Sequence, residues 1–510
     1  MTQGTRLSLL TFVFLASLLW NTGLVSDDFV DVVQLSKGTF WQNFWPQDNF
    51  INTPVGHLTH HLWFSTFDTL SAWRVDVLKI VYTTFSVGLL TYFFRQYHDL
   101  KDSLAISLIF CLYPSHDSIP FWFAPSGHLL STALFFVAAM WLKQGKIKRA
   151  SFLILFASFM VYGSTAVAAG LVVLLLAEGY QRQALWLAGL HCCYIAYFIT
   201  VSIVFKAAPS RLLESNSPVS LLKQLLLQIL TYLDSTMGAS MGYKLYYSVL
   251  AANPWHLIIG LACLGLASRV QCETELKGPQ RPLLWAMAAM MVASWFMFAI
   301  TGRYPQLAFN LGNRTTFWGS MLPSYLLAVG LRHPAMRAGI FTLLLVAWVG
   351  ISDHWKANWT EQKRVIETFH ANKEILGSLN PSEVIYVKGN QYSQLGPFSH
   401  IEFLSENWVC RALIQDCTGQ YREAVAFNKN LSFRNGQIFD KKYARFWAVG
   451  ADIAVFDSDT GKLERVQAND IQDALEGLPE QYRHWSQLPD SRLGRLVKNL
   501  ATTLMPRLAR

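Results

Sequence analysis

Long apolar runs separated by short polar segments occupy the first 353 residues of the chain. A helix needs about 20 mainly apolar residues to cross a bilayer. The first run follows one basic residue, Arg6, and no small-x-small cleavage site precedes Ser26, so we interpret it as an uncleaved first span. The pattern predicts about eleven spans, at 7–25, 77–94, 103–114, 127–142, 150–163, 164–178, 184–205, 245–267, 282–301, 318–331 and 338–352. Runs of about 13 residues are short for a simple span, and we expect some of these to be tilted, broken or re-entrant.

Alternate loops between these runs are rich in Lys and Arg. The basic loops are 95–102, 143–149, 178–182, 269–281 and 332–337. Because basic loops stay on the cytoplasmic side, this pattern predicts a cytoplasmic N-terminus. An odd number of spans then puts everything after residue 352 on the extracytoplasmic side. The opposite loop at 206–244 contains an amphipathic stretch, 221–233, which either rests on lipid or gates a cavity.

From residue 354 the composition becomes that of a soluble domain. The segments 384–387 and 453–456 are typical of short buried strands, and 470–475 of a helix. We therefore predict a transmembrane domain at 1–353 and a small α/β domain at 354–490. In 491–510 the leucines recur at helical spacing among Arg and Lys, which predicts a basic amphipathic helix. This helix lies either on a membrane surface or on its own domain.

The composition supports a mainly α, polytopic membrane protein. Charged residues make up 15% of the chain, against about 25% in soluble domains, which argues against a cytosolic enzyme and against a disordered or fibrous protein. The formal net charge is +9, but the basic residues sit in short loops between spans. Membrane lipids, rather than nucleic acid, are therefore the expected partners.

Cysteines contribute little to the prediction. Five of the seven lie in or beside apolar segments, where a thiol behaves as a small hydrophobe. Cys410 and Cys417 are the only pair in the polar C-terminal region, and whether they form a disulfide stays open. No CxxC or His/Cys cluster with zinc spacing occurs.

The strongest candidate chemistry is the acidic pair Asp27-Asp28, directly after the first span. Two adjacent carboxylates at a membrane boundary carry a desolvation cost unless they are hydrated, paired with a cation or used in a functional site. Such a carboxylate can take a proton from a hydroxyl, or hold a divalent cation against a phosphate. A solvated turn or helix cap is the alternative interpretation.

The features that follow the acidic pair form an ordered series: an aromatic run at 40–45, the segment Asn52-Thr53-Pro54-Val55-Gly56-His57-Leu58, and a second outside loop at 113–130. Over residues 7–145 this series resembles the GT-C superfamily of membrane glycosyltransferases. Later residues resemble it only in having many spans and an outside C-terminal domain. Two arginines common in the family are absent, with Asn52-Thr53 and Ser126-Gly127-His128 at the corresponding places.

The resemblance implies a role for several residues. Asp28 or Asp27 would be the catalytic base. Arg314, then Arg303, with His116, would bind the donor phosphate, since an Arg fork donates two parallel hydrogen bonds; snorkelling at the interface is the alternative for either arginine. Candidates for acceptor or donor contacts are Asp117, His57, His61 and His128. No zinc signature accompanies the histidines, and a divalent cation, Mg or Mn, is compatible with the carboxylates but not required.

The sequence thus predicts a GT-C-like membrane glycosyltransferase of a bacterial inner membrane, with a periplasmic C-terminal domain. It would move a sugar from a polyprenyl-phosphate donor to a cell-envelope glycan or lipid acceptor on the outer face, with inversion. A transporter or flippase for lipid-linked saccharides is one alternative, although such a protein would place ionisable groups deep inside spans. A non-catalytic GT-C-like relative is the other. The sugar, the acceptor and the oligomeric state stay open.

Overall fold

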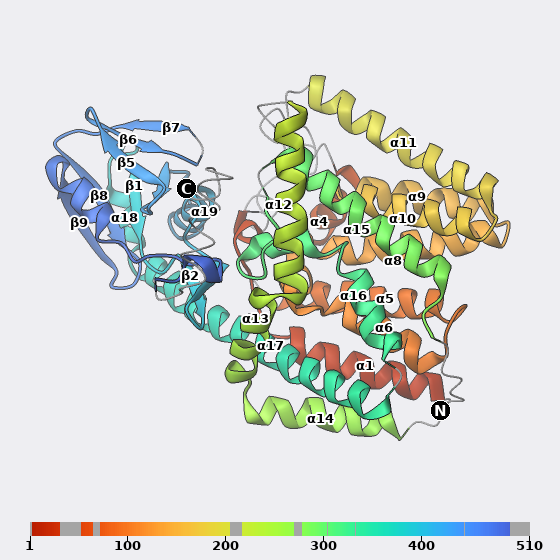
Figure 1. Cartoon of the computed structure of the whole chain (residues 1–510). Helices are drawn as coiled ribbons and strands as arrows, with labels where there is room; N and C mark the ends of the chain where they lie inside the picture. The colour runs from red at the N-terminus through yellow and green to blue at the C-terminus, as the bar shows by residue number, and fades with distance from the viewer. Residues whose placement is uncertain are drawn as a thin grey trace.

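The computed structural model describes residues 3–30, 53–64, 72–204, 217–269, 278–302, 304–331, 333–442 and 444–489. Helices dominate up to residue 378 and all described strands follow it (Figure 1). Arg303 and the predicted tail helix at 491–510 lie outside the described residues.

Apolar runs of the sequence coincide with the helices of the first part of the chain. Its longer helices are α1 (Gln3–Leu19), α4 (Pro54–Phe64), α5 (Ala72–Phe94), α6 (Leu100–Cys111), α8 (Phe123–Lys143), α9 (Ile147–Met160), α10 (Ser164–Ala177), α11 (Gln181–Val204), α12 (Pro218–Met237), α13 (Ala239–Ala251), α14 (Pro254–Ser268), α15 (Arg281–Thr301) and α17 (Pro334–Ala371). Between them lie short helices: η1 (Pro114–His116), α7 (Ser118–Phe121), η3 (Leu311–Thr316), α16 (Met321–Tyr325) and η4 (Leu326–Gly330). Each of the eleven predicted spans overlaps one or more of these helices.

Five described helices, α5, α8, α11, α15 and α17, are long and apolar enough to cross a membrane. A sixth span results if α12–α13 and α14, which are bent by 107° at a short break, are counted as one. The helices α1, α10 and α16–η4 are apolar but shorter. These are the properties of a membrane protein. The number of eleven spans stays a prediction.

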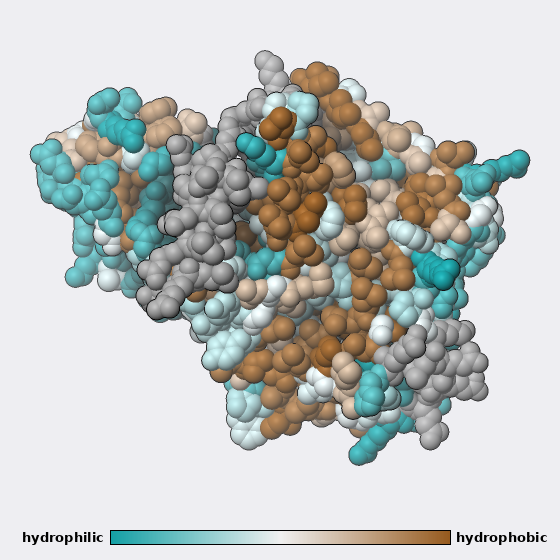
Figure 2. Space-filling view, in the orientation of Figure 1, coloured by the Kyte–Doolittle hydropathy of each residue, from teal (hydrophilic) through white to brown (hydrophobic). Residues whose placement is uncertain are grey.

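Figure 2 shows hydrophobic side chains over the helical part, including α12 and α14, and a mostly hydrophilic C-terminal part. On α12 the exposed apolar side chains recur every three or four residues, so they form one stripe; they are Val219, Leu222, Leu226, Leu230, Leu233 and Met237. This helix contains the amphipathic stretch 221–233 and runs crosswise to α17 in Figure 1.

The C-terminal domain is built on a four-stranded sheet with the order β4-β1-β8-β9. Its strands are β4 (Ala424–Ala426), β1 (Ile385–Lys388), β8 (Asp452–Asp457) and β9 (Lys462–Gln467). Strand β1 is parallel to both neighbours, and three of its four side chains are buried, as expected for an interior parallel strand. The two predicted strands are confirmed as β1 and β8, and the predicted helix as α20 (Ile471–Glu476).

The rest of the domain surrounds this sheet. Helices α18 (Lys373–Ser378) and α19 (Asn407–Thr418) pack together, and α19 covers β4. A hairpin of β2 (Tyr392–Leu395) and β3 (Phe398–Glu402) faces the membrane part, where the ring of Phe398 stacks on Phe309 at 4.1 Å. The antiparallel sheet β5 (Leu431–Arg434), β6 (Gln437–Asp440) and β7 (Arg445–Ala448) completes it. Cys410 and Cys417 are both buried free thiols on α19, because seven residues along a helix separate them by about 10 Å.

One helix, α17, connects the two parts of the molecule (Figure 1). It has 38 residues, and the predicted domain boundary at 353/354 falls inside it. Its C-terminal half contributes Trp359, Val365 and Phe369 to a hydrophobic cluster that both parts share; Trp359 lies against Gly23, and Phe369 packs on Phe456 of β8. Its other half crosses α13 so closely that a Cβ on Gly350 would lie 1.6 Å from the carbonyl oxygen of Ser248.

Candidate functional site

Asp28 fixes the loop after α1 to the start of α8. Its side chain is fully buried. Oδ2 accepts the N–H of Val25 at 3.0 Å, and Oδ1 accepts the N–H of Ala124 at 3.0 Å, within the first turn of α8. First-turn N–H groups have no partner inside the helix, so a carboxylate is a favourable acceptor there. Burial raises the pKa of Asp28 to about 7, against the opposing charge of Lys79.

A buried lysine on α5, Lys79, holds the same loop through hydrogen bonds. Lys79 Nζ donates to Thr22 Oγ1 and to the Gly23 carbonyl, both at 2.7 Å, and pairs with Asp76 at 2.9 Å. On the other side, Gly23 has φ of +70° and lies against the ring of Trp359 on α17, where a Cβ would come within 1.9 Å. Only glycine fits both this backbone conformation and this contact. The loop is therefore held rigidly between α5, α8 and α17.

Asp27 turns away from this anchor and toward the C-terminal domain. Its side chain is half-buried, and Oδ1 accepts a hydrogen bond from Trp408 Nε1 on α19 at 2.9 Å. Burial raises the pKa of Asp27, and the charge of Arg314 and the Trp408 hydrogen bond counteract only part of that rise. Asp27 is consequently a stronger base than an ordinary aspartate.

Arg314 lies opposite Asp27 on η3. Its Nη1 donates to the Leu311 carbonyl at 3.2 Å, and its guanidinium carbon lies 4.9 Å from the ring centroid of Trp122. Burial lowers the pKa of Arg314, but Tyr162, Asp27 and other nearby groups more than offset this, so the net shift is upward. The guanidinium stays charged and is oriented by the ring beneath it.

The C-terminal domain contributes further charges above these two residues. The charge of Glu402, at the end of β3, raises the pKa of both Asp27 and Arg314. The three charged groups are therefore neighbours. The charge of Lys442 lowers the pKa of Asp27, and Lys442 forms an ion pair with the buried Glu406. We call Asp27, Arg314, Glu402, Trp408 and Trp122 the Asp27–Arg314 site.

Asp117 belongs to a different cluster, which joins the two domains. Its Oδ1 accepts from Lys244 Nζ at 3.0 Å and from Asn313 Nδ2; its Oδ2 accepts from Trp355 Nε1 at 2.9 Å and from His400 Nε2 at 2.8 Å. Burial alone would raise the pKa of Asp117, but His400 and Lys244 outweigh it and hold the pKa well below its usual range. These five residues, which we call the interdomain network, come from the η1–α7 junction, α13, η3, α17 and β3.

Of the histidines, His128 borders the Asp27–Arg314 site, because its ring lies 5.6 Å from that of Tyr162, which also acts on Arg314. His116 is buried between the Phe110 carbonyl, 2.8 Å from Nε2, and Ser320 Oγ, 2.9 Å from Nδ1. Burial lowers the pKa of His116 to about 3, so its ring is neutral and its two nitrogens are occupied. His57 and His61 are buried on α4, which packs on α9.

The structure therefore brings together two of the residues predicted from the sequence, Asp27 and Arg314, with His128 beside them. It assigns Asp28 to the loop anchor and Asp117 to the interdomain network. Within the described ranges no three His, Cys, Asp or Glu side chains gather in a way that could hold a metal ion. Sequence reasoning missed Glu402, Trp408 and Lys442, because nothing in the pattern of the C-terminal domain indicates which of its loops meets the membrane part.

Chemically, the Asp27–Arg314 site combines a carboxylate of raised basicity with a fixed guanidinium. The carboxylate can take a proton from a hydroxyl group, and the guanidinium can stabilise an oxyanion that develops nearby. No protein-family model matches the chain, and no curated protein matches it either.

Proposed function

We propose that this protein is a membrane glycosyltransferase that uses a polyprenyl-phosphate sugar donor. The observation that carries the proposal is the proximity of Asp27, in the loop after α1, to Arg314, on η3 before α16, where each charge shifts the pKa of the other. Group transfer from a lipid phosphate needs both a base for the acceptor and a cation for the leaving group.

In the proposed reaction Asp27 takes the proton of an acceptor hydroxyl. The hydroxyl oxygen attacks the anomeric carbon, and the bond between that carbon and the phosphate oxygen breaks on the opposite face, which inverts the configuration. The phosphate leaves with the bonding electron pair, and its charge grows in the transition state. Arg314, held over Trp122, neutralises that charge.

Asp28 has a supporting role in this proposal. Both of its oxygens already accept backbone N–H groups, so it holds the loop that carries Asp27. Glu402 and Trp408 would contact the acceptor from the C-terminal side, because Trp408 donates to the same carboxylate that acts as base.

The orientation follows from the basic loops. With the N-terminus in the cytoplasm, the Asp27–Arg314 site faces the outer side of a bacterial inner membrane. Nucleotide sugars are absent there, whereas lipid-linked sugars are present, so the donor is a polyprenyl-phosphate sugar and the acceptor is a glycan or lipid of the cell envelope.

The test measures transfer of radiolabelled sugar from a panel of polyprenyl-phosphate donors to envelope acceptors in membranes that contain the full chain. Asp27→Asn should reduce turnover about 100- to 10,000-fold, the usual contribution of a general base. Arg314→Gln should reduce it about 100- to 1,000-fold, as for loss of one oxyanion donor, and Arg314→Lys should restore part of this. Matched controls are Asp473→Asn and Arg445→Gln, which alter exposed residues on α20 and β7.

Full turnover in Asp27→Asn at equal expression would refute the assignment of the base. Transport of a lipid-linked saccharide in proteoliposomes, without transfer from any donor, would refute the enzyme and favour a flippase.

A further inference from the structure

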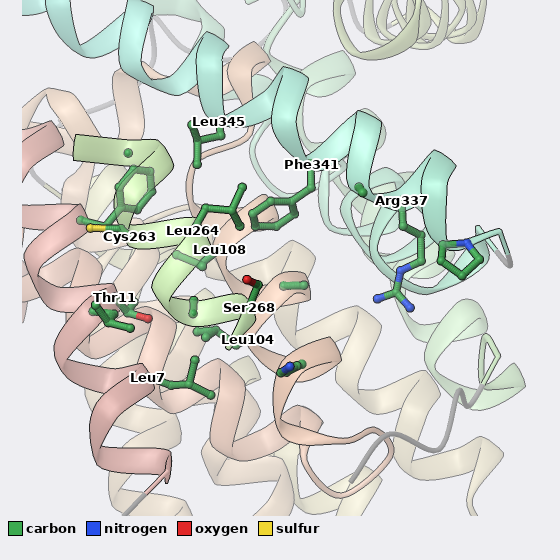
Figure 3. Close-up of a pocket in the computed structure, with 18 residues that line it drawn as sticks. Leu7, Thr11, Leu104, Leu108, Cys263, Leu264, Ser268, Arg337, Phe341 and Leu345 are labelled. Atoms are coloured by element: carbon green, nitrogen blue, oxygen red, sulfur yellow. The ribbon is translucent and has the colours of Figure 1, made fainter. Parts of the chain in front are cut away.

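An apolar cavity lies at the end of the helical part that the basic loops mark as cytoplasmic. It has a volume of about 600 Å³, is lined by α1, α6, α14 and α17, and is open on one side. In Figure 3, Arg337, Phe341 and Leu345 follow one another along α17, while Leu7 and Thr11 line the wall formed by α1. The lining is largely aliphatic and aromatic, so it suits hydrocarbon.

A second cavity of about 360 Å³ adjoins the first and extends toward η4. The two cavities share part of their lining, at Ala105, Leu264, Ser268, Arg337, Ala338 and Phe341. Two adjoining apolar compartments offer one place for each acyl chain of a diacyl lipid. A single-chain lipid would occupy only one of them.

Two basic residues lie beside these cavities. Lys101 lines the larger cavity, and Arg337 lines both. Arg337 pairs with Asp102 through one amino group and keeps its other donors. Lys101 is half-buried and makes no hydrogen bond or ion pair with any residue that the structure describes. Cations beside an apolar cavity at the level of the lipid headgroups attract an anionic headgroup.

We propose that the two cavities bind the acyl chains of an anionic diacyl phospholipid whose phosphate contacts Lys101 and Arg337. The charge selects the headgroup, and the paired compartments select two chains. This site is separate from the Asp27–Arg314 site, and its occupancy does not depend on the proposed transfer reaction.

The experiment titrates the purified full chain in detergent with lipids and counts bound molecules by native mass spectrometry. The probes are phosphatidylglycerol, phosphatidylcholine of the same chain length, and undecaprenyl phosphate. Phosphatidylglycerol should bind at least fivefold more tightly than phosphatidylcholine. Lys101→Gln should weaken it about fivefold, which corresponds to one cation near a lipid phosphate. Ala338→Trp should weaken binding of all diacyl lipids, because Ala338 lines both cavities and the larger side chain would fill space in them. Lys148→Gln, which alters an exposed lysine of another basic loop, should have no effect.

Three results would overturn the proposal. Equal binding of phosphatidylglycerol and phosphatidylcholine would remove the role of Lys101 and Arg337. Insensitivity of phosphatidylglycerol binding to both Lys101→Gln and Ala338→Trp would exclude these cavities as the site. Tighter binding of undecaprenyl phosphate than of phosphatidylglycerol, weakened by the same substitutions, would replace the diacyl lipid with a single-chain one.

Discussion

The substitution Asp117→Asn tests whether the interdomain network holds the C-terminal domain against the membrane part. Asp117 and Lys244 have side chains that are 1% and 0% exposed and are joined at 3.0 Å. After the substitution, the buried ammonium of Lys244 would lose its carboxylate partner, and the introduced amide, the Ala308 carbonyl and the His400 and Phe309 rings around it supply no negative charge. Removing one partner of a buried ion pair costs about 3 to 5 kcal/mol, because the other charge is left uncompensated. If this cost reduces the free energy that docks the C-terminal domain onto the membrane part, the fraction of undocked molecules rises about 150- to 4,000-fold.

A suitable reporter is the backbone amide of Asn310, which donates across the interface to His400 Nδ1 at 3.2 Å. Hydrogen–deuterium exchange of peptides that contain this amide should accelerate by the same factor in Asp117→Asn. The amide of Phe427, which bonds to the Val387 carbonyl inside the C-terminal sheet at 2.8 Å, should exchange as in the wild type.

Two further variants complete this test. Glu480→Gln breaks the exposed pair with Lys429 and should cost less than about 1 kcal/mol. The double variant Asp117→Asn/Lys244→Met should be less harmful than the sum of the single variants, since it leaves no buried charge unpaired. Exchange at Asn310 that is no faster in Asp117→Asn than in Glu480→Gln would refute the reasoning.

Two other predictions concern single positions. The folded-state pKa of Asp28, about 7, lies above its ordinary value of 3.8, so its contribution to stability is complete at pH below 3.8 and is lost as pH rises through 7. The melting temperature should therefore fall over this pH range, and infrared spectra should show a carboxyl band that titrates near pH 7. Asp28→Asn should show neither this fall in melting temperature nor this band. Gly350→Ala should destabilise the protein by about 1 to 3 kcal/mol through its clash with the Ser248 carbonyl, whereas Gly339→Ala on the same helix, with no atom within 4 Å of the added Cβ, should not; equal melting temperatures for the two variants would contradict the close crossing of α13 and α17.

Hydrophobic pattern predicted where helices lie in the first part of the chain, because a run of apolar residues has no other stable conformation in lipid. It did not predict how far α17 continues. Composition changes at residue 354, which suggested the end of the span, but the helix continues because Trp359, Val365 and Phe369 pack into a hydrophobic cluster shared by the two parts. Their burial depends on a tertiary contact that periodicity alone does not reveal.

The site was predictable in part for a similar reason. Position after a span and at an interface singled out the acidic pair and Arg314. Neighbouring residues in a helical turn point about 100° apart, so the sequence could not tell that Asp28 would turn to α8 and Asp27 to Trp408. Glu402 depends on how the β2–β3 hairpin docks on the membrane part, which no local pattern encodes.

The continuous helix α17 also fixes the distance and the rotation between the membrane part and the C-terminal domain. Insertion or deletion of one residue between Gly350 and Trp359 would shift everything beyond it by about 1.5 Å and rotate it by about 100°. Trp408 would then no longer reach Asp27, and His400 would lose Asp117. The number of residues in α17 is thus as constrained as their identity, and a length change there would separate the two halves of the site without altering any of its side chains.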